Sequence, residues 1–143
     1  MNTSESFING KKILVLDDSE EFLDLIEMWF NKKYDSDVTF FGDYRKLLDA
    51  DFTGVDALII DYNLNGGMFA PKVIRKIRKA NPDLLIITMS GEFTEDIKSA
   101  KETELMLLTL NSGSNRVCTK NLHSLEIILS THLRVREEAM LVS

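Results

Sequence analysis

Cysteine, positive charge and long apolar runs are all scarce in this chain of 143 residues. The single cysteine, Cys118, excludes a disulfide within the chain and favours a reducing compartment. No apolar run approaches the roughly 20 residues that a membrane-spanning helix needs. The polar N-terminal residues lack the basic stretch and apolar core of a signal peptide. We therefore expect a soluble, cytoplasmic protein without a membrane segment.

Lysine and arginine number 17 against 23 acidic residues, which leaves a formal net charge of -6. A broad electrostatic contact with nucleic acid needs clustered basic residues, so we do not expect nucleic acid as a partner. Hydrophobic residues make up 44% of the chain and charged residues 28%, which is ordinary for one globular domain. We expect a flexible tail over residues 1–10, a domain over 11–135, and a helix end with a short tail over 136–143.

Short apolar runs alternate with amphipathic helical stretches along the whole chain. The runs are rich in branched residues, as in strands buried on both faces, and cover Lys12–Leu16, Val38–Phe41, Asp56–Ile60, Leu84–Met89 and Arg116–Thr119. The helical stretches carry apolar residues at helical spacing and cover Ser19–Lys33, Asp43–Ala50, Pro71–Ala80, Thr94 to about Leu108, and Leu122 to about Leu141. Turn residues predict a loop over Asn63–Gly67 and a turn over Asn111–Asn115.

Strands that alternate with helices predict parallel βαβ units, with helices on both faces of one sheet. Five such units are too few for an eight-stranded barrel. We therefore expect an α/β protein of the flavodoxin-like (βα)5 type, a doubly wound parallel sheet of five strands in the order 2-1-3-4-5. In sheets of this kind, ligands bind beyond the carboxyl ends of the strands, where the strand order reverses.

Polar side chains that can bind ions follow four of the predicted strands. Asp17 and Asp18 follow the first strand, Asp61 the third, Ser90 the fourth and Lys120 the fifth. Because the first and third strands are neighbours in the predicted order, we expect the three aspartates to converge at one edge of the sheet. Since this edge opens into solvent, we expect the carboxylates to stay hydrated rather than buried.

Three converging carboxylates repel one another, and a hard divalent cation relieves the repulsion. Mg²⁺ suits one or two carboxylates with waters and a phosphate oxygen, whereas Ca²⁺ prefers more protein oxygens than this site offers. Lys120 could neutralise a second anion and Ser90 could donate a hydrogen bond to it, so the set could hold a phosphoryl group on Asp61. Taken singly, Ser90 could also be a turn residue and Lys120 a solvated lysine beside a helix.

The ordered set resembles the receiver domain of two-component response regulators, over about residues 11–135. The resemblance implies that Asp61 is the phosphoacceptor. It also implies that Asp17, Asp18, Asp61 and the backbone carbonyl of Asn63 bind Mg²⁺.

The same resemblance gives roles to residues beyond the acidic set. Ser90 and Lys120 correspond to the hydroxyl and the lysine that contact the phosphoryl group. Asn63 and Glu92 stand where the family tunes self-dephosphorylation, and this pair is similar to that of chemotaxis-type regulators. A short-lived phosphoryl state is therefore expected.

Three positions depart from the pattern of the family. Asn65 and Asn121 stand where the family usually has proline, and Val117 replaces the aromatic residue of the usual conformational switch. The stretch from Ser90 to Lys120 is also several residues longer than is usual in the family, and the additional residues lie in ELMLLTLNSGSN. We expect a looser loop at Asn65 and a rebuilt face around the fourth helix, fifth strand and fifth helix.

The resemblance implies a stand-alone receiver that takes a phosphoryl group from a histidine kinase or a histidine phosphotransfer protein. It would signal by contact with a downstream protein, or as a homodimer through the face of the fourth helix, fifth strand and fifth helix. It would be no enzyme beyond its own phosphorylation and dephosphorylation. The alternative is a degenerate receiver that binds proteins without being phosphorylated, which the three departures favour. A flavin carrier or a phosphatase is disfavoured, because DDSEE is neither a phosphate-binding loop nor an Asp-x-Asp motif.

Overall fold

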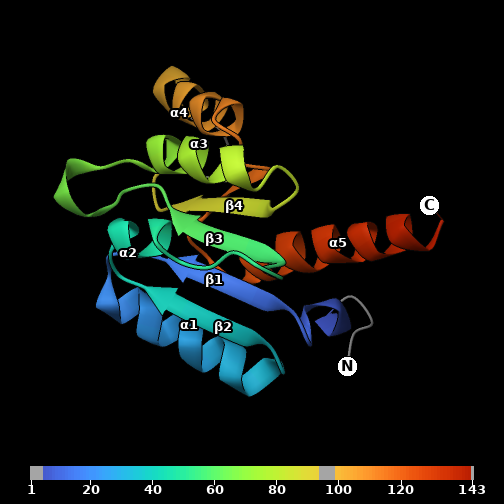
Figure 1. Ribbon diagram of the computed structural model, residues 1–143. Coiled ribbons are helices and arrows are strands. Elements are labelled where there is room, and N and C mark those ends of the chain that lie inside the picture. Colours follow the sequence, from blue (N-terminus) through green and yellow to red (C-terminus); the bar gives the residue numbers. More distant parts are fainter. Residues whose placement is uncertain (1–4, 94–98, 143) are drawn as a thin grey trace.

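The computed structural model describes residues 5–93 and 99–142, which form a single parallel sheet with helices on both faces (Figure 1). The strands are β1 (Lys12–Leu16), β2 (Asp37–Phe41), β3 (Ala57–Asp61), β4 (Leu85–Ser90) and β5 (Arg116–Thr119). The helices are α1 (Glu20–Lys33), α2 (Tyr44–Leu48), α3 (Ala70–Ala80), α4 (Ala100–Asn111) and α5 (Leu122–Leu141), with 3₁₀ turns η1 (Glu5–Ile8) and η2 (Asn65–Gly67). The strand order is β2-β1-β3-β4-β5, so the predicted fold class and topology are confirmed.

The sheet divides the core into two layers because successive side chains of a strand point to opposite faces. In β1, Ile13 and Val15 pack with α1 and α5, whereas Leu14 and Leu16 pack with α2 and α3. The central strands are buried on both faces, which explains their continuous apolar runs. No helix among residues 5–93 and 99–142 is long and apolar enough to cross a membrane.

Polar residues cap the helices that start near the carboxyl ends of the strands. The side chain of Ser19 accepts a hydrogen bond from the backbone of Phe22, which fixes the start of α1. Asn121 caps α5, because its side chain accepts a hydrogen bond from the backbone of Ser124. The cap at Asn121 therefore fixes the start of α5 directly after Lys120.

The prediction of a flexible tail over residues 1–10 is wrong for residues 5–10. Ile8 is fully buried in the core layer that α1 and α5 share, and the backbone of Gly10 donates to the carbonyl of Asp35 at 2.5 Å. The Ser36 hydroxyl donates to the carbonyl of Ile8 at 2.7 Å. The polar residues around Phe7 and Ile8 concealed this packing, in which Phe7 also lies against the same core layer.

The stretch ELMLLTLNSGSN before β5 forms most of α4 and the turn that follows it. The prediction that this helix starts at Thr94 falls outside the described residues; α4 begins at Ala100, capped by Ser99, and continues to Asn111. Arg78 of α3 holds the turn, because its guanidinium donates to the carbonyl of Gly113 at 2.5 Å and to Asn115 Oδ1 at 3.0 Å. This stretch is thus tied to the domain.

Candidate functional site

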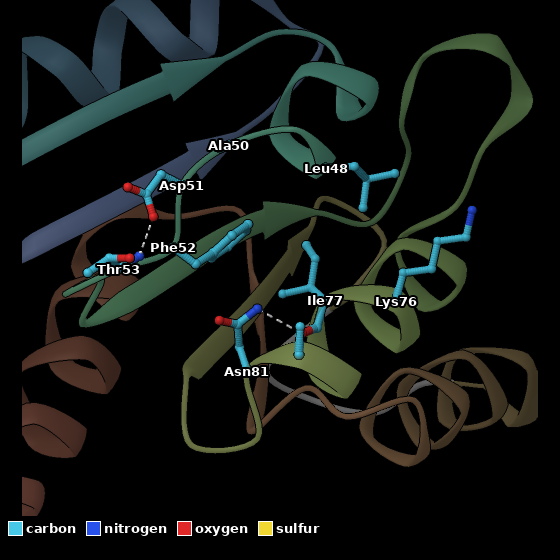
Figure 2. A pocket seen from close by; sticks show the side chains of 9 residues that line it. Leu48, Ala50, Asp51, Phe52, Thr53, Lys76, Ile77 and Asn81 are labelled. Carbon is cyan, nitrogen blue, oxygen red and sulfur yellow. Dashed lines mark hydrogen bonds between the residues drawn. The ribbon is translucent and has the colours of Figure 1, made fainter.

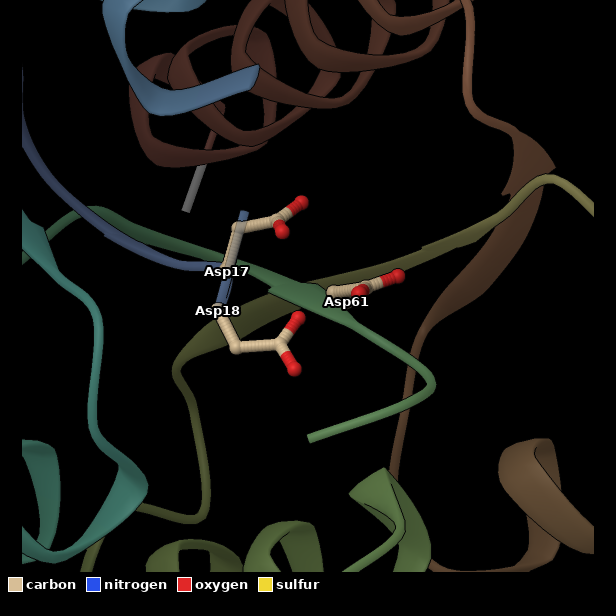
Figure 3. Close-up of side chains that lie close together, drawn as sticks. All are labelled: Asp17, Asp18 and Asp61. Carbon is tan, nitrogen blue, oxygen red and sulfur yellow. The ribbon is translucent and has the colours of Figure 1, made fainter. Parts of the chain in front are cut away.

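Three carboxylates meet at the carboxyl edge of the sheet, where β1 and β3 end side by side (Figure 3). Leu16 pairs with Ile60 in the parallel register, so the next residues along the two strands, Asp17 and Asp61, lie at the same level. One carboxylate oxygen from each of Asp17, Asp18 and Asp61 lies within 4.8 Å of the others. The predicted convergence of the three aspartates is confirmed.

Two of the three carboxylates are buried, so the expectation that they stay hydrated is wrong. Asp17 is 0% exposed and Asp61 is 5% exposed, whereas Asp18 faces solvent. An ionised carboxylate in such a place needs a charged or hydrogen-bonding partner.

Asp17 has two different partners for its two oxygens. Its Oδ1 accepts a hydrogen bond from the backbone of Ser19 at 2.9 Å, which links the carboxylate to the start of α1. Its Oδ2 lies 2.7 Å from Lys120 Nζ and accepts no hydrogen bond from the described residues beyond this charge contact. The ammonium group therefore compensates a buried negative charge.

Asp61 is held in an environment that disfavours its negative charge. Burial raises the pKa of Asp61 to about 7, the charges of Asp17 and Asp18 push it the same way, and the Lys120 ammonium opposes them. Lys120 Nζ lies 3.6 Å from Asp61 Oδ2, farther than from Asp17. A cation placed between the three carboxylates would stabilise the ionised form.

Lys120 reaches the site from the end of β5. Its backbone N–H donates to the carbonyl of Ser90 at 3.2 Å, which joins the ends of β4 and β5. Its Nζ also lies over the aromatic ring of Phe22, 4.4 Å from the ring centroid. The helical pattern placed Phe22 on the core face of α1, and its contact with the site was missed. The sequence signal for this contact is that Phe22 lies one helical turn after Ser19, the N-cap that follows Asp18.

Ser90 ends β4, and Asn63 and Glu92 lie just beyond the ends of β3 and β4. Ser90 is 1% exposed, and its Oγ accepts a hydrogen bond from the backbone of Glu92 at 3.0 Å. Asn63 and Glu92 are exposed and follow β3 and β4, as the sequence predicts. The Asn63 carbonyl as a metal ligand and the tuning roles of both residues stay predictions.

Val117 leaves space near the site instead of filling it. Its half-buried side chain lines a cavity of about 350 Å³ between α4, β5 and α5, together with Phe93, Met106 and Ile127. This face thus has a hollow at Val117, and its rebuilding relative to the family stays a prediction.

A separate hollow lies against α3, lined by the end of α2, the loop that follows α2, and α3 itself (Figure 2). It measures about 680 Å³, and two of its polar side chains are paired locally: Asp51 accepts from the backbone of Thr53, and Asn81 donates to the carbonyl of Ile77. The titratable side chains that lie close together are those of Asp17, Asp18, Asp61 and Lys120, at the carboxyl edge of the sheet.

The acidic set fits a small divalent cation. It offers three carboxylate oxygens in one place, one of which, on Asp17, has only an ammonium group as its partner. Oxygen donors of this kind are those that Mg²⁺ takes in proteins.

Solved structures of similar fold are receiver domains, whereas no model of a known protein family and no curated protein matches the sequence. A CheY-like response regulator receiver domain protein from Methanospirillum hungatei superimposes with a TM-score of 0.72 at 19% identity, over 92% of this chain and 99% of that one. The receiver domain of a Francisella response regulator gives 0.69 at 24% identity, over 90% and 99%.

This chain has the receiver-domain fold. A third similar structure holds the receiver domain of the Saccharomyces cerevisiae response regulator Ssk1 together with the histidine phosphotransfer protein Ypd1. It gives a TM-score of 0.67 at 14% identity, over 82% of this chain and 85% of that one. In the receiver fold of this chain, Asp17, Asp18, Asp61 and Lys120 meet at the predicted edge.

Proposed function

We propose that this chain is a phosphoacceptor receiver of a two-component phosphorelay and that Asp61 accepts the phosphoryl group. The observation that carries the proposal is the meeting of three carboxylates and one ammonium group at the carboxyl edge of a receiver fold. A structural role for these residues would not require two buried carboxylates to share one lysine.

In the proposed reaction, a carboxylate oxygen of Asp61 attacks the phosphorus of a phosphohistidine. The new O–P bond forms as the P–N bond breaks, and the leaving imidazole keeps the bonding electron pair and takes up a proton. Mg²⁺, held by Asp17, Asp18, Asp61 and the Asn63 carbonyl, would supply charge neutralisation at the phosphoryl oxygens. Lys120 lies close enough to Asp61 to pair with a phosphoryl oxygen. The Ser90 hydroxyl would donate a hydrogen bond to another phosphoryl oxygen.

The donor that we propose is a histidine kinase or a histidine phosphotransfer protein. The similar yeast receiver is seen with a partner of the second kind, which supports this class of donor. The output would be contact with a downstream protein or a second copy of the chain. The face of α4, β5 and α5 suits such a contact, because Ile127 lines the hollow at Val117 and is 52% exposed. We place the relay in the cytoplasm.

The second candidate is a receiver fold that binds proteins without phosphorylation. Two observations favour it: Lys120 lies closer to Asp17 than to Asp61, and Val117 cannot act as an aromatic switch. Both candidates use the same fold, and phosphorylation of Asp61 separates them.

The deciding experiment is intact-mass measurement after incubation with Mg²⁺ and acetyl phosphate. We expect one added phosphoryl group on the wild type, none on Asp61→Asn, and loss of the label on chelation of Mg²⁺ before the reaction. Asp24→Asn, which removes an exposed acid of α1 outside the cluster, is the matched control and should label normally. An unlabelled wild type beside a labelled control receiver would support the binding-only candidate.

A further inference from the structure

Phe22 is the one aromatic side chain that the described residues place over the ammonium group of the site. Lys120 Nζ lies 4.4 Å from the centroid of its ring. An ammonium group within about 6 Å of a ring centroid is attracted to the negative face of the ring. Lys120 keeps 22% of its side chain exposed, so the ring also shields the cation from part of the solvent.

The start of α1 connects the position of Phe22 to that of Asp17. The backbone N–H of Phe22 donates to Ser19 Oγ at 3.2 Å, and the backbone N–H of Ser19 donates to Asp17 Oδ1 at 2.9 Å. These two hydrogen bonds hold the ring and the carboxylate in one rigid turn. The ammonium group of Lys120 lies against both, 2.7 Å from Asp17 Oδ2.

Lysine has a flexible four-carbon stem, so its ammonium group does not hold one position without contacts. Asp17 would become a metal ligand when Mg²⁺ binds, which would weaken its hold on Lys120. The aromatic ring carries no formal charge and does not bind Mg²⁺, so its contact with Lys120 persists. The ring is then the contact that keeps the ammonium group within reach of Asp61, which lies 3.6 Å away.

We infer that Phe22 is a positioning residue for Lys120, holding the ammonium group at the place where it meets a phosphoryl group on Asp61. This role rests on the proposed phosphoacceptor function. Phe22 does not touch the reacting atoms and acts through the lysine alone.

The first test observes the contact without any phosphoryl transfer. In the free protein, the ε-methylene protons of Lys120 should show an upfield NMR shift from the ring of Phe22. Phe22→Leu and Phe22→Met should each remove the shift, and Phe22→Tyr should keep it. Trp29→Leu removes an aromatic ring from the same helix, away from Lys120, and should leave the shift unchanged. A Lys120 signal that is the same in the wild type and in the folded Leu or Met variant would overturn the inference.

The second test measures the rate of labelling by acetyl phosphate with Mg²⁺. Phe22→Leu and Phe22→Met should label about three to ten times more slowly than the wild type, the range that one cation–π contact gives. Phe22→Tyr should restore the rate, and Trp29→Leu should keep it. If the wild type and Phe22→Leu label at equal rates while Lys120→Ala labels slowly, the role of Phe22 is overturned and the phosphoacceptor function stands. No labelling of the wild type would overturn the phosphoacceptor function and the role that rests on it.

Discussion

The site carries more negative charge than its own residues neutralise. Among residues 5–93 and 99–142, the three carboxylates of Asp17, Asp18 and Asp61 face one ammonium group, that of Lys120, which lies 2.7 Å from Asp17 and 3.6 Å from Asp61. Two of the carboxylates are buried, so the remaining repulsion is poorly screened by solvent. The cluster therefore gains stability from a cation or from the loss of one carboxylate charge.

We predict that Asp61→Asn stabilises the protein at high pH. Burial and the neighbouring acids raise the pKa of Asp61 to about 7, against about 3.9 in an unfolded chain. The folded state thus binds this proton more tightly, so stability falls as the pH rises from about 4 to about 7 and stays low above that. In urea unfolding with chelator, we expect the variant to exceed the wild type by about 2 kcal/mol near pH 8, about half of what the full pKa shift would give because solvent screens part of the repulsion, and to match it near pH 4.

Two controls belong with this measurement. Asp24→Asn removes an exposed acid from α1 and should give no gain that depends on pH in this way. Added Mg²⁺ should stabilise the wild type by relieving the same repulsion, and Asp61→Asn should respond much less. A variant that is less stable than the wild type near pH 8 would show that the three carboxylates do not repel in the folded protein.

At the scale of elements, the sequence predicts the parts of the fold that follow from periodicity. The alternating runs place all five strands and the edge where Asp17, Asp18 and Asp61 meet, because one register rule brings the ends of parallel strands together. Contacts between distant segments carry no such signal. Ile8 packs against the core from a polar stretch, and Arg78 reaches a turn 35 residues away. Burial of the carboxylates was missed for the same reason.

The hydrogen bonds of the Arg78 guanidinium should contribute to stability through their geometry as well as through the charge of the group. Its guanidinium donates to the carbonyls of Leu84 and Gly113 and to Asn115 Oδ1. Lysine keeps the charge but cannot bridge three acceptors, so we predict that Arg78→Lys destabilises the protein by about 1–3 kcal/mol. Denaturant unfolding measures the change, and Arg75→Lys on the exposed side of α3 is the control. An equal loss of stability in both variants would mean that the substitution weakens α3 itself, and not the hydrogen bonds of Arg78.

The N-terminal turn should behave as part of the domain. Ile8 is fully buried, and α5 packs on the turn that carries it. We predict that Ile8→Ala lowers the free energy of unfolding by about 2–4 kcal/mol, the usual cost of a cavity in a core. Val142→Ala, at a position 87% exposed, should change it little. A near-zero effect of Ile8→Ala would restore the prediction of a loose tail.

At the scale of the whole molecule, the acidic edge and the face of α4, β5 and α5 are joined through the ends of two strands. Ser90 and Lys120 are linked by a backbone hydrogen bond at 3.2 Å, and Val117 lies three residues before Lys120, at the hollow. A change in the position of Lys120 therefore acts directly on the strand that lines the hollow. At the hollow this face also carries the side chain of Ile127, which is 52% exposed.

We predict that beryllofluoride with Mg²⁺, a stand-in for the phosphoryl group, increases self-association through this face. Light scattering after size-exclusion chromatography should show a larger mass for the wild type and no change for Asp61→Asn. Ile127→Glu should abolish the increase while still labelling with acetyl phosphate, because the substitution adds charge to an apolar contact. Leu25→Glu, on an equally exposed apolar residue of α1, is the matched control and should associate normally. A wild type that binds beryllofluoride and stays monomeric would exclude the homodimer and leave a separate downstream protein as the target of this face.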